Sequence, residues 1–423
     1  SRLDITATKT WCRTGRHECP YYVRFKKSND QGVFMMKNSD RQFTVDNWGY
    51  PPQNRQSFQH VQSLFPTARL RRGAGPITTF GSHSKDILNM TYAGADGSQR
   101  TVQQMFDDSY TDAFIVVKDN AILCEHYANG MAADSFHLLN SVTKSFVGML
   151  AGIHISKGLI QETDLVTQYL PELADTAFSE STIRHLLDMT AAPKYGEDYT
   201  DRSADFWVEA AVVGWRPALR TKESATTLLA HATTLTDSEQ SNGEKYHYRT
   251  VLTNVLGMVL ERAGKGSLQE QLQNELWQKL GPQQDAAIVV DSVGFPYVGA
   301  GMNACARDLA RFGQMIIQQG EYNGEQIVPQ QWIDDTRHAN DQAKINFAQS
   351  DYGAMMPGGH YRNQVWVEDA DKGVLVAIGI HGQVIYMNMQ TQVVIVKLST
   401  HPQPSSSLFQ DGFIAMRALS ESL

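Results

Sequence analysis

The chain has 423 residues, of which 42% are hydrophobic, enough to bury a large core and to form more than one domain or lobe. Its 37 basic and 45 acidic side chains give a net charge of -8, and no Lys/Arg cluster marks a nucleic-acid surface. No apolar stretch reaches the roughly 18 residues that a membrane-spanning helix needs. We therefore expect a globular protein that does not bind nucleic acid and has no membrane span.

The first 75 residues are rich in Arg, Asn, Gln and aromatic side chains and show little periodicity. We interpret residues 1–75 as an N-terminal arm packed on the body of the protein. Cys12 and Cys19 lie in this arm and could close a small disulfide loop, but two free thiols fit the spacing equally well. The chain starts at Ser1, which favours a periplasmic or extracellular protein that has lost an export signal. A trimmed chain or a cytoplasmic location is the alternative.

The body of the protein begins with a predicted hairpin. Two β-rich runs flank Asp119 and Asn120, a pair typical of a tight turn between antiparallel strands. A helix is expected to follow from Ser141 and to end at Gly158, a residue suited to a C-terminal cap. Between about 160 and 290, apolar residues recur at helical spacing, and long irregular connections separate these segments.

The last third of the chain contains a further amphipathic helix, three strand-like runs joined by tight turns, and a final helix from about Ser407 to Leu419. This order predicts an α/β (α+β) fold, in which an antiparallel sheet built from both ends of the chain is flanked by helices. We assign residues 76–160 and 290–423 to this sheet domain and residues 161–289 to an inserted, mainly helical domain. A substrate cleft is expected between the two.

Ser141 and Lys144 stand three residues apart at the head of an almost unbroken apolar run. Positions three apart share one face of a helix, so the amine is expected near the hydroxyl. Burial lowers the pKa of a lysine, and a neutral amine can accept the serine proton. Alternatively, Ser141 caps the helix and Lys144 extends to solvent. The same S-x-x-K spacing recurs at residues 82–85 without an apolar helix, and we attribute that copy to chance.

Two later segments add to this pattern. Tyr248 stands directly before a predicted helix, with Thr250 two residues further on, and its phenol could relay protons at an attacked carbonyl. The alternative is an aromatic side chain that packs at a helix start. A predicted strand ends in residues 379–383, where two glycines would let a substrate approach the backbone. The alternative there is a sheet strand with a bend.

In this order, the three motifs resemble those of the serine β-lactamase/penicillin-recognising superfamily. The stretches "HLLNSVTKS", "YGEDY", "GWR" and "ARDLARFGQM" more closely resemble its 6-aminohexanoate-dimer (nylon-oligomer) hydrolase branch, and the resemblance runs from about Trp48 to the end of the chain. It implies a β-lactamase-like, class C-like fold and a serine hydrolase that needs no metal and no organic cofactor.

Carried over position by position, the resemblance makes Ser141 the nucleophile, Lys144 its base partner and Tyr248 the acid/base that protonates the leaving group. The backbone amides of Ser141 and Ile380 would form the oxyanion hole. The side chains expected to contact the substrate are Tyr195, Thr250, His381 and Gln383. For His381, a purely structural role is the alternative.

Two departures from the superfamily pattern limit the substrate. Thr250 replaces the asparagine of the Y-x-N motif, and the K-T-G triplet aligns with Ala377-Ile378-Gly379, whose side chains cannot bind a substrate carboxylate as Lys and Thr do. Penicillin or D-Ala-D-Ala recognition is therefore disfavoured. We expect an acyl-enzyme hydrolase of small linear amides or esters, such as 6-aminohexanoate oligomers.

Two alternatives stay open at this point. One is a carboxylesterase of short acyl or hydroxyalkanoate esters with weak β-lactamase activity, and the other is a non-catalytic sensor domain of the same fold. The expected partner is a small-molecule amide or ester substrate, and a homodimer is left open.

Overall fold

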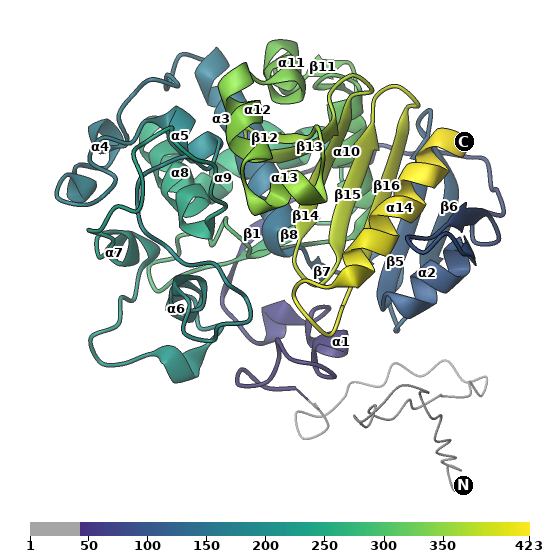
Figure 1. The fold of residues 1–423 in the computed structure, drawn as a ribbon, viewed down its shortest axis with the longest axis horizontal. Coiled ribbons are helices and arrows are strands. Elements are labelled where there is room, and N and C mark those ends of the chain that lie inside the picture. Colours follow the sequence, from purple (N-terminus) through teal and green to yellow (C-terminus); the bar gives the residue numbers. More distant parts are fainter. Residues whose placement is uncertain (1–42) are drawn as a thin grey trace, which may run out of the picture.

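The computed structural model describes residues 43–423 (Figure 1). Cys12 and Cys19, and with them most of the predicted arm over 1–75, lie outside these residues. In the part that is described, Cys124 and Cys305 are free thiols. No helix within residues 43–423 is both long and apolar enough to cross a membrane.

An eight-stranded sheet of order β12-β13-β14-β15-β16-β5-β6-β2 forms one half of the molecule. The predicted hairpin is confirmed, because β5 and β6 pair antiparallel and the turn residues Asp119 and Asn120 adopt positive φ angles of 47° and 60°. The predicted C-terminal meander is confirmed as β14, β15 and β16. The strands are β2 (Gly81–Ser82), β5 (Thr111–Lys118), β6 (Ala121–Tyr127), β12 (His360–Arg362), β13 (Val365–Asp369), β14 (Val374–Gly379), β15 (Gln383–Asn388) and β16 (Val393–Ser399).

Both ends of the chain build this sheet, since β16 pairs antiparallel with β5. Every residue of β16 is buried because helices cover both faces. Helix α10 (Ala306–Ile317) packs on one face, and α14 (Ser407–Ser422) lies over the other together with α2 (Val102–Asp108), as Figure 1 shows. The close approach of α10 depends on Gly313, where a Cβ atom would lie only 2.6 Å from the Val394 side chain. The predicted sheet flanked by terminal helices is therefore confirmed.

A second, four-stranded sheet of order β1-β8-β9-β7 was not predicted. Its strands have two to four residues, too few to show a period of two in the sequence. Strand β1 also ties the end of the predicted arm into the body. The strands are β1 (Thr67–Leu70), β7 (His137–Leu138), β8 (Ala286–Val289) and β9 (Met302–Ala304), and two further pairs join β3 (Thr91–Ala93) to β4 (Gln99–Thr101) and β10 (Glu321–Tyr322) to β11 (Glu325–Gln326).

The predicted insert is helical between the two sheet segments, although its domain limits stay a prediction. Helices in this part are α4 (Val166–Tyr169), α5 (Ile183–Leu187), α6 (Asp205–Val212), α7 (Leu228–Ala232), α8 (Thr250–Ala263) and α9 (Leu268–Leu272). Helices outside it are α1 (Asn54–Ser57), α11 (Gln330–His338), α12 (Asp341–Ala348) and α13 (Asp351–Met355).

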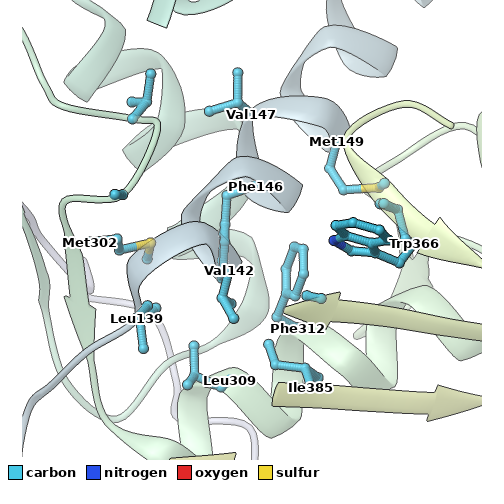
Figure 2. Packing of buried hydrophobic residues seen from close by; sticks show 14 of the residues in the cluster. Leu139, Val142, Phe146, Val147, Met149, Met302, Leu309, Phe312, Trp366 and Ile385 are labelled. Carbon is cyan, nitrogen blue, oxygen red and sulfur yellow. The ribbon is translucent and has the colours of Figure 1, made fainter. Parts of the chain in front are cut away.

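The segment from Ser141 onward forms a short 3-10 turn, η3 (Asn140–Val142), followed by α3 (Thr143–Ser156). Helix α3 is buried on all sides for most of its length, and Phe146 stacks on Phe312 of α10 with ring centroids 3.9 Å apart (Figure 2). Gly158 follows with a φ of +67°, so the predicted glycine cap is confirmed. The rigid packing of α3 fixes the residues on its first turn.

Candidate active site

Ser141 and Lys144 meet in the structure as the sequence predicts. Lys144 Nζ donates hydrogen bonds to Ser141 Oγ at 2.8 Å, to Thr250 Oγ1 at 2.9 Å and to the Gly299 carbonyl at 2.7 Å. Only 1% of the Lys144 side chain is exposed, so it does not extend to solvent. The alternative of a solvent-directed lysine is therefore wrong.

Burial changes the acid–base chemistry of Lys144. Desolvation lowers the pKa of its amine from 10.5 to about 8, and the charges of Glu197 and Glu209 only partly oppose this shift. At pH 7 a group with such a pKa is neutral in roughly one molecule in ten. A neutral amine beside a hydroxyl is a base that can take the hydroxyl proton.

The phenol of Tyr248 completes this group. It lies within hydrogen-bonding reach of the Ser141 hydroxyl, and Lys144 Nζ is 4.9 Å from the centroid of its ring. Burial, followed by the nearby Tyr361 and Glu197, raises the pKa of Tyr248 well above its usual value. Trp366 stacks on the ring at 5.3 Å and holds it in place. Tyr248 is thus a protonated phenol directed at the same hydroxyl.

The end of strand β14 passes directly beside Ser141. A Cβ atom at Gly379 would lie 2.3 Å from the Leu139 carbonyl oxygen and 3.0 Å from the Ser141 nitrogen, so only glycine allows this approach. Asn140 ties the two segments together, since its Nδ2 donates to the Ile380 carbonyl at 3.0 Å. The backbones of Ser141 and Ile380 are therefore neighbours.

Glu197 supports the site and was not singled out from the sequence. Its carboxylate accepts hydrogen bonds from the Thr250 hydroxyl and from the Tyr199 phenol, each at 2.7 Å, and from the Thr250 backbone N–H. It therefore orients the hydroxyl to which Lys144 donates. The available signal was the "YGEDY" stretch, which contains both Glu197 and Tyr199.

A second acidic side chain, Glu209, also acts on the charge of Lys144. Glu209 accepts a hydrogen bond from Asn254 Nδ2 at 2.6 Å, and Asn254 Oδ1 accepts one from the Gly299 N–H at 2.8 Å. Gly299 in turn presents its carbonyl to Lys144. Desolvation raises the pKa of Glu209 to about 7. A single acid in the apolar run "FWVEAAVV" was the sequence signal for this buried carboxyl.

The four side chains predicted to contact substrate are all buried. Tyr195 is 0% exposed and donates to Glu209, while Thr250 is committed to Lys144 and Glu197. Gln383 bonds the Ser399 backbone through both its oxygen and its nitrogen. The geometry therefore does not support direct substrate contact by these three, because each polar atom already has a partner inside the protein.

His381 follows the same pattern. Its ring lies 2.7 Å from the His401 carbonyl oxygen through Nδ1, and burial lowers its pKa to about 4, so the ring is neutral. The backbone turns here through positive φ angles, 63° at His381 and 94° at Gly382. The structure therefore agrees with the two alternatives that the sequence left open, a structural role for His381 and a sheet strand with a bend.

Other candidate chemistry lies away from Ser141. Ser82 and Lys85 of the second S-x-x-K copy are both exposed, which agrees with a chance occurrence. Within residues 43–423, no cluster of three or more His, Cys, Asp or Glu side chains has an arrangement that could hold a metal ion.

Comparison with known proteins gives the family. The Beta-lactamase family model matches residues 99–418. The chain belongs to the beta-lactamase family. It is 33% identical over 368 residues to a curated relative, the 6-aminohexanoate-dimer hydrolase of Paenarthrobacter ureafaciens, with 86% of this chain and 89% of that protein covered. The resemblance noted in the sequence is confirmed.

Solved structures confirm the beta-lactamase-like fold. A Bacillus anthracis protein provisionally named as a 6-aminohexanoate-dimer hydrolase superposes with a TM-score of 0.81 at 24% identity, over 91% of this chain and 98% of that chain. A hydrolase with promiscuous acyltransferase activity gives a TM-score of 0.58 at 17% identity, over 75% and 96%. Its membership of the beta-lactamase family and its similarity to this curated relative make the protein a serine hydrolase of amides or esters. The alternative of a non-catalytic sensor domain is therefore rejected.

Proposed function

We propose that the protein hydrolyses small linear amides or esters through an acyl-enzyme formed on Ser141. The observation that carries this proposal is the 2.8 Å hydrogen bond between the buried amine of Lys144 and Ser141 Oγ. When Lys144 is neutral, its Nζ takes the hydroxyl proton while Oγ forms a bond to the substrate carbonyl carbon. The carbonyl electron pair moves onto its oxygen, which becomes the oxyanion of a tetrahedral intermediate.

We infer that the main-chain N–H groups of Ser141 and Ile380 stabilise this oxyanion. Support comes from the close approach of Gly379 to Ser141 and from the Asn140 hydrogen bond that joins the two segments. Each donor of an oxyanion hole typically contributes about 2.7–4 kcal/mol to the transition state. A backbone donor held by packing costs no reorganisation during the reaction.

Tyr248 would protonate the leaving group. As the intermediate collapses, the carbon–nitrogen or carbon–oxygen bond breaks and the phenol gives its proton to the departing amine or alcohol. The Lys144 ammonium, whose Nζ lies 4.9 Å from the centroid of the Tyr248 ring, then returns its proton to the Tyr248 phenolate. Water attacks the ester on Ser141 by the reverse route, which releases the acid and restores the serine.

The proposed substrates are linear amides of the 6-aminohexanoate-oligomer type. The name of the Paenarthrobacter relative supports this class, and so does the replacement of the K-T-G side chains by Ala377 and Ile378. Neither side chain can donate to a carboxylate or to a lactam. Esters of similar shape would use the same proton transfers.

The test of the proposal is covalent capture. A fluorophosphonate probe is expected to label the wild-type protein once, and peptide mass spectrometry should find the modification on Ser141. A quenched reaction with a p-nitrophenyl acyl ester should leave the matching acyl group on the same peptide. Ser141→Ala should carry neither adduct. Labelling of a different residue, or of Ser141→Ala as strongly as wild type, would reject Ser141 as the nucleophile.

The pH profile gives a second prediction. We expect kcat/KM to rise with pH through an apparent pKa of about 8, because acylation needs neutral Lys144 and deprotonation supplies it. Glu197→Gln should move this profile to lower pH, since Glu197 is the negative charge that most raises the pKa of the amine, and its removal lowers that pKa further. Initial rates between about pH 6 and pH 10 would measure both. A profile that is flat in wild type, or that shifts upward in Glu197→Gln, would contradict the role of Lys144.

A further inference from the structure

Two arginines, Arg202 and Arg216, pack against the ring of Tyr50. The guanidinium carbon of Arg216 lies 4.8 Å from the centroid of the Tyr50 ring, and that of Arg202 lies 5.4 Å from it. Within residues 43–423, neither guanidinium forms an ion pair with an Asp or Glu side chain. Two like charges on one ring attract an anion.

Arg216 is held in place by its surroundings. Its guanidinium lies 4.1 Å from the centroid of Trp207 and 5.9 Å from that of Trp48. The backbone at Gly49 passes so close that a Cβ atom there would be 2.9 Å from Arg216 Nη1. Burial lowers the pKa of Arg216, because the protein has partly removed this cation from water without supplying a counter-ion.

The guanidinium keeps donors for a ligand. Arg216 Nη1 donates to the Trp215 carbonyl at 2.9 Å, which uses one of five N–H groups. The Arg216 side chain is half-buried and Arg202 is exposed, so solvent reaches the pair. A planar, fixed guanidinium with unused donors is matched to a carboxylate, which it can bind through two parallel hydrogen bonds.

Two chains of contacts connect Arg216 to residues around the proposed reaction centre. Arg216 packs on Trp207, and the ring of Trp207 lies 6.4 Å from the ring of Tyr199. Tyr199 donates a hydrogen bond to Glu197, which orients the Thr250 hydroxyl. The charge of Arg216 also reaches His381, the residue after Ile380, where it helps to lower the pKa of the ring.

The second chain of contacts starts at Trp215, whose carbonyl accepts a hydrogen bond from Arg216. Its ring meets Tyr297 at 5.2 Å, two residues before the Gly299 whose carbonyl accepts from Lys144. Trp215 and Tyr297 therefore connect the Arg216 guanidinium through packed contacts to the segment that holds Lys144.

We propose that Arg216 and Arg202 form a subsite for the terminal carboxylate of a linear amide substrate. This inference rests on the proposed function and makes it more specific, because it names the residues that hold the carboxylate end of the substrate. The half-buried ring of Tyr199 offers apolar surface for the methylene spacer. Ala377 and Ile378 leave the usual K-T-G position without a cation, so the arginine pair supplies one at a different place.

The experiment compares two linear amides that differ only at one end, which is a free carboxylate in one and a primary carboxamide in the other. We expect wild type to prefer the carboxylate by about 10- to 100-fold in kcat/KM, as for a pair of charge-assisted hydrogen bonds. In Arg216→Gln the ratio should fall toward one, and in Arg202→Gln it should fall by a smaller factor. Arg220→Gln, an exposed arginine of the same loop, should keep the wild-type ratio.

A binding measurement makes the result independent of turnover. Calorimetry of both amides on the full-length Ser141→Ala protein should give the same preference, and it should weaken with added salt. If Arg216→Gln does not fold, Arg216→Lys replaces it in the test. Lysine keeps the positive charge but cannot form two parallel hydrogen bonds with a carboxylate, so the preference for the carboxylate should fall in part. Equal affinities for the two amides, or a preference that survives both Arg216→Gln and Arg202→Gln, would overturn the subsite.

Failure of the subsite and failure of the proposed function give different results. If Ser141→Ala hydrolyses both amides as fast as wild type, the proposed function is wrong, and the kcat/KM ratio of the two amides in wild type and in the arginine variants still decides on the subsite. If Ser141→Ala is inactive and the carboxylate has no advantage, only the subsite is wrong.

Discussion

Ser141→Ala, Lys144→Ala and the double variant are expected to lower kcat/KM for a p-nitrophenyl ester by nearly the same factor, on the order of 10⁴ to 10⁶. The hydroxyl and the amine act as one unit, since Oγ is a weak nucleophile until Nζ at 2.8 Å takes its proton. Removal of either group therefore removes the whole contribution, and the second change adds little. Steady-state kinetics with active-site titration would measure the three factors.

Lys397 provides a matched control for the loss of a buried lysine. It is 2% exposed and donates to Ser399, and burial lowers its pKa to about 7, so it repeats the buried lysine–serine contact with a serine other than Ser141. Lys397→Met is expected to change the melting temperature and to leave kcat/KM within about tenfold of wild type. Lys144→Arg should be as inactive as Lys144→Ala, because an arginine stays charged. A Lys144→Ala protein that keeps wild-type rates would disprove the base role.

The parts of the fold that were predictable have strong local signals. The β5–β6 hairpin is indicated by Asp119-Asn120 between two β-rich runs, and strands β14 to β16 are long, nearly continuous apolar runs. Strands β12 and β13 and the second sheet were missed, because strands of two to five residues carry too few alternations. Their formation depends on partners distant in the sequence.

The site shows the same division between local and distant geometry. The Ser141–Lys144 contact was predictable since it depends on one helical turn, and Tyr248 followed from its place before a helix. Which tyrosine of "YGEDY" is internal was not predictable: Tyr195 is fully buried on Glu209, whereas Tyr199 is only half-buried beside Glu197. That choice depends on how the loop packs against α6.

Tyr248→Phe is expected to separate amide from ester hydrolysis. A leaving amine must receive a proton as the carbon–nitrogen bond breaks, so loss of the phenol should lower kcat for a linear amide by about 10²- to 10⁴-fold. A p-nitrophenolate group leaves without a proton, and its ester should therefore lose much less. Phenylalanine keeps the ring contact with Trp366 at 5.3 Å, so the packing of the site should survive.

Tyr246→Phe is the matched control for this change. Tyr246 belongs to the same aromatic cluster, with its ring 6.3 Å from that of Trp366, but its buried hydroxyl has no hydrogen-bond partner among the described residues. Its removal should leave both activities and the melting temperature close to wild type. Equal losses on amide and ester in Tyr248→Phe would place the phenol in serine activation instead. No loss on the amide would assign leaving-group protonation to Lys144, the other proton donor in contact with Ser141.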